Sequence, residues 1–227
     1  MFDEGVIKFR AAHRQGSLET RLYSELACKL IAWREILAKT GLVGQRKDRY
    51  GGFGYGNVSG RVGPPGMPRG QRSFLITGTQ TSGKECVSLG DFCVVKSYDD
   101  SRNEAQSFGP ALPSSESLTH GAIYDLGPQI RFVLHGHTPT IWRRARELRI
   151  PTSEPKVAYG TPQMAAEVRR LYRSTSLAET KILAMGGHED GVIVFGHSAE
   201  EAGQILLAYL ARAFETDCRA DGGLCSF

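Results

Sequence analysis

IRFVLHGH, residues 130–137, is the most informative segment of the sequence. It is mostly apolar and ends in two histidines, as in a buried strand that carries polar groups at one end. Because side chains alternate along a strand, His135 and His137 leave it on one face, whereas Phe132 and Leu134 point to the other. The segment therefore predicts a core strand that presents two imidazoles to one site, where they can share a metal ion.

Helix and strand patterns alternate around this segment. Helical periodicity and capping signals predict helices at residues 17–40, 113–126, 140–148, 161–172 and 198–214. Short apolar runs predict further strands at residues 73–77, 92–97, 181–185 and 191–196. The glycine-rich residues 51–60 and the loops expected at 63–70 and 99–110 lie between them. This order fits one mixed α/β domain over residues 1–227, because no repeat or linker divides the chain.

Composition excludes several classes of protein. The chain has 227 residues, of which 41% are hydrophobic and 23% charged, as in soluble globular proteins and unlike collagen-like or disordered chains. Its net charge of +4 is too small for a dedicated nucleic-acid binder. No run of about 18 apolar residues occurs, and the acidic start MFDEGVIKFR is unlike a signal peptide. We therefore expect a cytoplasmic protein with a small-molecule substrate and no nucleic-acid or membrane partner.

Two other parts of the chain are less regular. Five cysteines without a C-x-x-C motif indicate reduced, structural thiols. Residues 215–227 lack the helical period of the preceding segment, so we expect a mobile C-terminal tail there. The arginines at 143, 144, 146 and 149 are spaced for a helix surface, where a solvated face is the simplest interpretation.

Two further groups are candidates for a site at the end of the histidine strand. His188 lies in GGHEDG, a loop between two predicted strands, and is the expected third metal ligand, with His197 as the alternative. Glu116 and His120 are four residues apart and share one face of the predicted helix. An acid at a helix start is also favoured by the helix dipole, so Glu116 has a purely structural interpretation too.

Five motifs together resemble the class II aldolase and adducin family, which includes fuculose-phosphate aldolase and ribulose-phosphate 4-epimerase. In the family's order, they are GYGNVSGR at 54–61, FLITGTQTSG at 74–83, PSSESLTHGAIY at 113–124, VLHGH at 133–137 and GGHEDGVIVFG at 186–196. The resemblance covers most of the chain. It implies a three-layer α/β/α sandwich with a mainly antiparallel central sheet, assembled as a homotetramer with active sites between subunits.

The resemblance also implies roles for individual residues. It makes Glu116 the catalytic acid/base and a further ligand of the resting metal, and it makes Zn²⁺ ligands of His135, His137 and His188. It assigns a substrate phosphate to Asn57, Ser82, Gly83, Ser114 and Ser115. Hydroxyls, an amide and backbone N–H groups near a helix start suit an anion, although serines in this position also cap helices. Thr79 and Thr81 are alternatives in the second motif, which is longer than the family's T-P-x-G.

Two departures from the family pattern bear on the reaction. The turn after the third histidine is His-Glu-Asp-Gly where the family has His-Gly, and residues 150–159 lack the segment that carries the aldolase's catalytic tyrosine. The predicted function is a zinc-dependent, aldolase-like lyase acting on a small hydroxy-carbonyl compound, expected to be a sugar phosphate, through a metal-stabilised enediolate. An epimerase, dehydratase or decarboxylase on the same metal site is the alternative. A non-catalytic adducin-like interaction module is the alternative from another class.

Overall fold

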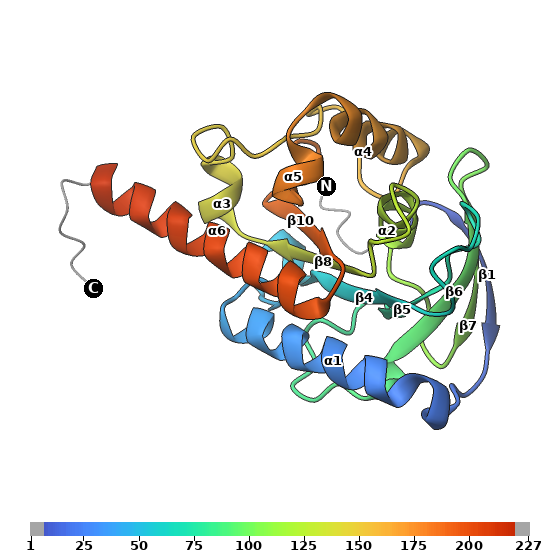
Figure 1. Cartoon of the computed structure of the whole chain (residues 1–227). Helices are drawn as coiled ribbons and strands as arrows, with labels where there is room; N and C mark the ends of the chain where they lie inside the picture. The colour runs from blue at the N-terminus through green and yellow to red at the C-terminus, as the bar shows by residue number, and fades with distance from the viewer. Residues whose placement is uncertain (1–6, 221–227) are drawn as a thin grey trace.

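The computed structural model describes residues 7–220, which form a large sheet with helices on both of its faces (Figure 1). The sheet has eight strands in the order β1-β7-β6-β5-β4-β8-β10-β9. They are β1 (Arg10–Gln15), β4 (Asn57–Arg61), β5 (Phe74–Thr77), β6 (Phe92–Asp99), β7 (Glu104–Gly109), β8 (Phe132–His137), β9 (Ile182–Ala184) and β10 (Gly191–Gly196). The pair β1 and β7 is parallel, and the other neighbouring strands are antiparallel. A separate ladder joins β2 (Gly44–Gln45) and β3 (Gly54–Tyr55).

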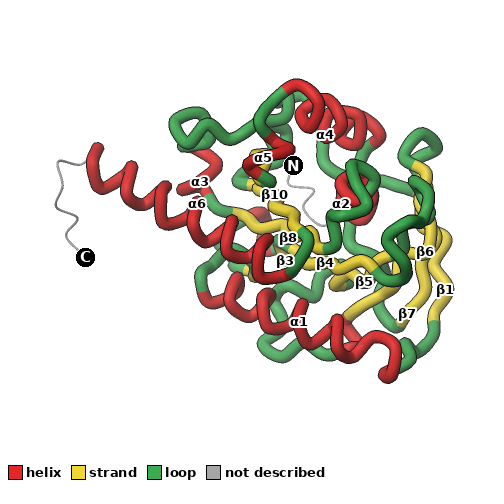
Figure 2. Tube along the Cα trace, viewed as in Figure 1, coloured by secondary structure: helices red, strands yellow, loops and turns green. Residues whose placement is uncertain are grey.

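Six α-helices and two short 3₁₀ turns lie among these strands in the described part of the chain (Figure 2). The helices are α1 (Thr20–Lys39), α2 (Ser117–Tyr124), α3 (Pro139–Arg143), α4 (Pro162–Ser174), α5 (Leu177–Thr180) and α6 (Ala199–Ala220). The turns are η1 (Tyr50–Gly52) and η2 (Leu89–Asp91). None of the helices within residues 7–220 is long and apolar enough to cross a membrane.

The two faces of the sheet carry separate hydrophobic clusters. Leu134 of β8 packs in the cluster that contains Leu30 of α1 and Leu206 of α6. Val133, its neighbour on β8, belongs to the other cluster, with Leu118 of α2 and Val168 of α4. The predicted alternation along this strand is therefore confirmed. It places the two histidines of β8 on the same side as α2 and α4.

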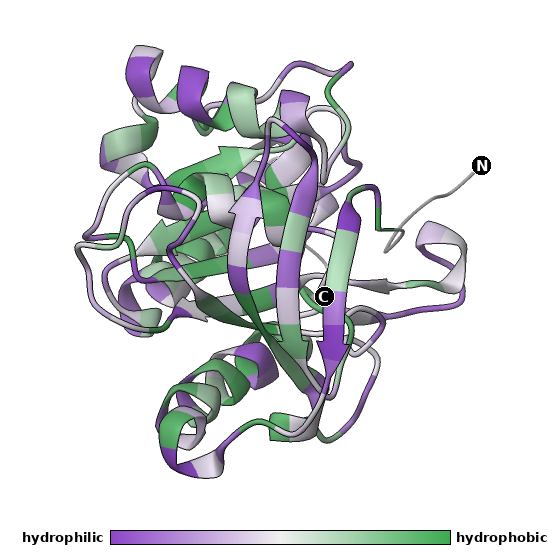
Figure 3. Cartoon of the chain, turned by 90° about the vertical axis from the view of Figure 1, so that its right-hand side faces the viewer, coloured by the Kyte–Doolittle hydropathy of each residue, from purple (hydrophilic) through white to green (hydrophobic). Residues whose placement is uncertain are grey.

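The fold is mixed α/β with a mostly antiparallel sheet, as expected, although one strand pair is parallel. The stricter description as a three-layer sandwich stays a prediction. At one edge, β1 has the sequence RAAHRQ, and its hydrophilic ends are visible in Figure 3, which views that edge of the sheet. Charged residues on an edge strand disfavour pairing with another chain, so this edge is protected.

The sequence patterns missed three strands of the large sheet, and both strands of the small β2–β3 ladder. β1 lies before the first predicted helix, β4 lies in the glycine-rich stretch 51–60, and β7 lies in the predicted loop 99–110. Their sequences, RAAHRQ, NVSGR and EAQSFG, lack the apolar alternation of a typical strand. All five residues of β4 are nevertheless buried, because the strand lies between β5 and β8. Its polar side chains make hydrogen bonds there: Ser59 with His120 and Tyr124, and Arg61 with backbone carbonyls of neighbouring loops.

The C-terminal tail is shorter than expected. Helix α6 continues to Ala220, so residues 215–220 are helical and the predicted start of the tail at residue 215 is wrong. Asp217 forms an ion pair with Arg144 at 2.7 Å, which ties this end of the helix to the segment after α3. Residues 221–227, the rest of the predicted tail, lie outside the described residues.

Candidate active site

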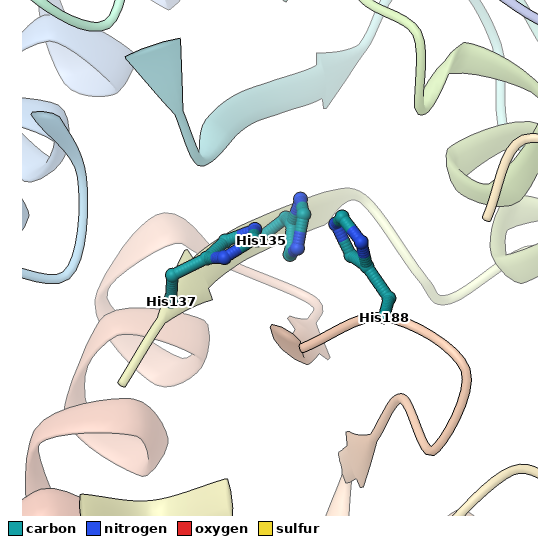
Figure 4. A group of neighbouring side chains, drawn as sticks. All are labelled: His135, His137 and His188. Atoms are coloured by element: carbon teal, nitrogen blue, oxygen red, sulfur yellow. The ribbon is translucent and has the colours of Figure 1, made fainter. Parts of the chain in front are cut away.

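The side chains of three histidines lie close together over one face of the sheet, at the C-terminal end of β8 (Figure 4). His135 and His137 come from β8 and His188 from the loop before β10, and one nitrogen of each lies within 4.8 Å of the others. All three side chains are buried. His197, the alternative third ligand, lies apart from them with 70% of its side chain exposed, and its Nδ1 is 2.6 Å from Glu201 Oε2. The structure thus brings together the three residues predicted as metal ligands.

Burial keeps these imidazoles neutral. It lowers the pKa of His135 to about 3 and the pKa values of His137 and His188 well below their usual range, because an apolar surrounding disfavours the charged form. A neutral imidazole offers a lone pair to a metal ion. Among residues 7–220, His135 Nε2 has no hydrogen-bond partner, although it is fully buried. Three neutral nitrogen donors close together, one of them a buried nitrogen without a hydrogen-bond partner in the described chain, fit a divalent transition ion such as Zn²⁺.

Asn57 lies beside this cluster. It is opposite His135 in the β4–β8 register, and its Nδ2 is 3.4 Å from His135 Nδ1. A half-turn of the Asn57 amide about its terminal bond presents Oδ1 to this imidazole in place of Nδ2. When Nε2 of His135 binds a metal, Nδ1 carries the proton and needs an acceptor, which Oδ1 supplies. Asn57 is therefore placed to orient His135, and its predicted contact with a substrate phosphate stays a prediction.

The turn that carries His188 is tight. The His188 N–H donates to the Met185 carbonyl at 3.1 Å, and the Gly191 N–H donates to the His188 carbonyl at 3.0 Å. A Cβ on Gly191 would lie 2.8 Å from His188 Cδ2, so only glycine leaves room for the imidazole there. Tyr159 packs its ring 4.4 Å from the His188 ring and is itself buried. Tyr159, the last residue of the short stretch 150–159, thus packs against a predicted metal ligand.

Glu116 lies next to the histidines at the start of α2. The residue is 1% exposed, and its Oε1 is 3.6 Å from His188 Nε2. Burial raises the pKa of Glu116 to about 7, although Thr119 and the positive charge of Lys8 oppose the shift. A carboxyl with a pKa near neutrality exchanges protons readily under physiological conditions. The position and the pKa of Glu116 suit a general acid/base.

Two serines predicted to bind phosphate lie at the start of α2. Ser114 Oγ accepts from the Glu116 N–H at 3.3 Å, and its carbonyl accepts from the Ser117 hydroxyl at 2.7 Å, so Ser114 also organises the helix start. Ser115 is 5% exposed, and its hydroxyl makes no hydrogen bond with any other residue of the described range 7–220. Of the two, Ser115 has the hydroxyl with no structural partner.

The other predicted phosphate residues lie in the segment after β5. Ser82 Oγ donates to the carbonyl of Gly56 at 2.7 Å. Since Gly56 precedes Asn57, this bond brings Ser82 close to the start of β4. A Cβ on Gly83 would lie 2.2 Å from Gln45 Oε1, so a larger residue at this position would require the Gln45 side chain to move. Residue 79 donates its N–H to the Leu112 carbonyl at 3.0 Å and so connects this segment to the chain just before Ser114. The two predicted phosphate segments therefore lie side by side.

Sequence patterns did not single out Arg49, Tyr50 or Asp190, which lie against the histidine cluster. The Tyr50 hydroxyl donates to Asp190 Oδ2 at 2.7 Å, and Arg49 Nη2 is 3.6 Å from the same oxygen. The Tyr50 ring is 4.8 Å from the His137 ring. Asp190 belongs to the His-Glu-Asp-Gly turn, and its carbonyl accepts from the Thr138 N–H at 2.8 Å. Asp190, one of the two residues by which this turn departs from the family pattern, is thus bonded to the rest of the site.

Replacement of Tyr50 by phenylalanine removes the hydrogen bond to Asp190 but keeps the ring against His137. Because Asp190 lies two residues after His188, the loop should hold the third ligand less firmly, and we expect metal affinity to fall by about 10-fold. Competition with a chromogenic chelator measures this affinity. Tyr172→Phe is the matched control, since the Tyr172 ring lies on α4 with its centroid 6.3 Å from that of Phe195, outside the cluster. Equal affinities of the Tyr50→Phe protein and the wild type would contradict the prediction.

Comparisons with known proteins identify the family of this chain. Residues 37–218 match the model of the class II aldolase and adducin N-terminal domain. A search of curated proteins by sequence returned no match.

Solved structures of similar fold include several sugar-phosphate aldolases. An L-fuculose-1-phosphate aldolase from Thermus thermophilus has a TM-score of 0.62 and 18% identity, with 91% of this chain and 100% of that chain covered. A sugar-phosphate aldolase from Thermotoga maritima has a TM-score of 0.62 and 14% identity, covering 89% and 100%. Another L-fuculose 1-phosphate aldolase has a TM-score of 0.61 and 19% identity, covering 90% and 88%. Because the family model spans most of the chain, this protein belongs to the class II aldolase and adducin family.

Proposed function

We propose that this protein is a Zn²⁺-dependent, aldolase-like lyase that acts on a small hydroxy-carbonyl compound, expected to be a sugar phosphate. The observation that carries the proposal is the buried cluster of three neutral imidazoles with the Glu116 carboxyl 3.6 Å from one of them. The family itself is enzymatic and includes aldolases and epimerases. The sugar-phosphate aldolases of similar fold support the choice of substrate class.

Each residue of the site would have a separate role in this reaction. His135, His137 and His188 would hold the ion, and Asn57 would keep the His135 ring in position. A divalent ion bound there stabilises the negative charge that develops on the substrate's carbonyl and neighbouring hydroxyl oxygens. Glu116 would take a proton from, or return it to, the substrate atom next to the carbonyl, through the oxygen nearest His188. The burial of all four side chains limits access of water to the reacting atoms.

Other reactions on the same site are the alternative. Epimerisation, dehydration and decarboxylation also place negative charge next to a carbonyl, so the same donors and the same carboxyl would serve them. The alternative from another class, a non-catalytic adducin-like module, is disfavoured by the cost of burying a carboxyl and three imidazoles that an interaction surface does not need. We also propose a homotetramer with active sites between subunits, on the family resemblance.

A substrate screen tests the proposed function. The zinc-loaded protein is incubated with short ketose and aldonate phosphates, and products are identified by mass spectrometry and NMR. Cleavage into two carbonyl fragments supports the lyase, whereas an epimer, or loss of water or carbon dioxide, supports one of the alternatives. Absence of turnover with every compound, in protein that retains its metal, would favour the non-catalytic module.

Replacement of Ser115 by alanine tests the phosphate site. The variant loses a hydroxyl that makes no other hydrogen bond in the described chain, so the fold should be unaffected. Loss of one charge-assisted hydrogen bond to phosphate is expected to raise KM about 10- to 150-fold for a phosphorylated substrate, with little effect on its unphosphorylated analogue. Ser117→Ala is the control, because its hydroxyl donates to the Ser114 carbonyl. Equal effects of Ser115→Ala on both substrates would mean that Ser115 does not bind phosphate.

A further inference from the structure

A cavity of about 750 Å³ opens near the β9 edge of the sheet, and none of the residues proposed for the active site lines it. It lies among α3, the chain that follows α3, and the turn before α5. We call it the arginine pocket and define it by the residues that matter here. They are Trp142, Arg143, Arg146, Arg149, Pro151 and Pro155.

The pocket carries positive charge without a counter-charge. Its three arginines follow one another at intervals of three residues, and all three are exposed. No residue within 7–220 forms an ion pair with any of them, and no carboxylate lines the pocket. Arg144, in the same segment, by contrast pairs with Glu147 at 3.1 Å and with Asp217 at 2.7 Å. Like charges that line one pocket repel one another, so the arrangement favours a bound anion.

The floor of the pocket is apolar and rigid. The Trp142 indole is half-buried, and its Nε1 donates to the Met185 carbonyl at 2.8 Å, which sets the plane of the ring. The Ala184 N–H donates to the Pro151 carbonyl at 2.9 Å, so the proline is attached to the edge strand β9. Arg149 adopts a left-handed backbone conformation, with φ of 55°, which few non-glycine residues adopt without support from their surroundings. A preformed surface of this kind loses little entropy when it binds a ligand.

We propose that the arginine pocket binds a small aromatic phosphate ester. The guanidinium groups, whose planar donors match phosphate oxygens, bind the anionic end. The indole and the two prolines pack against the aromatic body, and an aromatic ring is also a favourable neighbour for arginine. This ligand is distinct from the substrate of the metal site, because it requires neither the histidines nor Glu116.

Tryptophan fluorescence provides a direct test. The sequence contains two tryptophans, and Trp33 packs against Gly203 of α6, so Trp33→Phe leaves Trp142 as the only reporter. Titration of this protein with phenyl phosphate should give a saturable change in emission. Phenol has the aromatic ring but no phosphate, and inorganic phosphate has no ring. Each should bind at least about 10-fold more weakly than phenyl phosphate.

Matched variants localise the binding. Arg146→Gln and Arg149→Gln should each weaken phenyl phosphate binding about 10-fold, whereas Arg21→Gln, at an exposed position of α1, should not. His135→Ala should leave the titration unchanged. Retention of full affinity in both arginine variants, or its loss in His135→Ala, would overturn the proposal, as would a linear, non-saturable titration.

Sedimentation velocity of the same samples tests the competing occupant, a second copy of the chain. If the arginine variants change the oligomeric state and phenyl phosphate does not bind, the pocket is a subunit interface and the proposal is wrong. The metal-site function is tested separately, by the metal content and turnover of the wild-type protein, so failure of the pocket proposal leaves that test unchanged.

Discussion

Replacement of His135 or His137 by alanine is expected to remove the transition ion from a protein that otherwise holds close to one per chain. The two side chains supply two of the three nitrogen donors, from positions i and i+2 on one face of a strand. No other histidine of the described chain belongs to this cluster. Residues that only support a ligand typically change metal affinity about 10- to 100-fold. Loss of a ligand itself should therefore cost more than about 100-fold.

Elemental analysis after zinc loading and dialysis measures this effect. His188→Ala should also weaken binding, and His197→Ala is the matched control, because that imidazole is exposed and bonded to Glu201. A larger effect of His197→Ala than of His188→Ala would mean that the third ligand is wrong. A wild-type protein that holds no ion after zinc loading would remove the basis of the proposed function.

Replacement of Glu116 by glutamine should lower kcat about 10²- to 10⁴-fold, the range expected when a general acid/base is lost. Glutamine keeps the size of the side chain and fits the same buried position, but it cannot exchange a proton at any accessible pH. Metal content should change little, since the three imidazoles remain. This combination separates a role in proton transfer from a role in holding the ion.

Turnover is measured with the substrate found in the screen, alongside metal content in the same preparation. Glu179→Gln is the control, because Glu179 lies on the exposed surface of α5 and should have wild-type activity. Unchanged turnover in Glu116→Gln would show that another group moves the proton. Loss of both metal and activity would instead show that Glu116 helps to hold the metal ion.

Local patterns were sufficient to predict the strand that carries His135 and His137. Alternation along a strand depends only on neighbouring residues, so the separation of His135 from Leu134 follows from the sequence. The helices at α4 and α6 were predicted for the same reason, since their apolar period lies within the helix itself. β4 was missed because its sequence, NVSGR, is polar and derives its burial from β5 and β8 on either side.

The sequence by itself therefore determined that two imidazoles share a strand face, and the family motifs added His188 and Glu116. Only the tertiary structure decided which distant residues support them. The Tyr50 hydroxyl meets Asp190 across 140 positions of the chain, and Asn57 reaches His135 because the sheet places β4 beside β8. The pKa values of the site likewise depend on burial, which many segments produce together. A local pattern specifies how a segment presents its side chains, but the order of the strands specifies which segments meet.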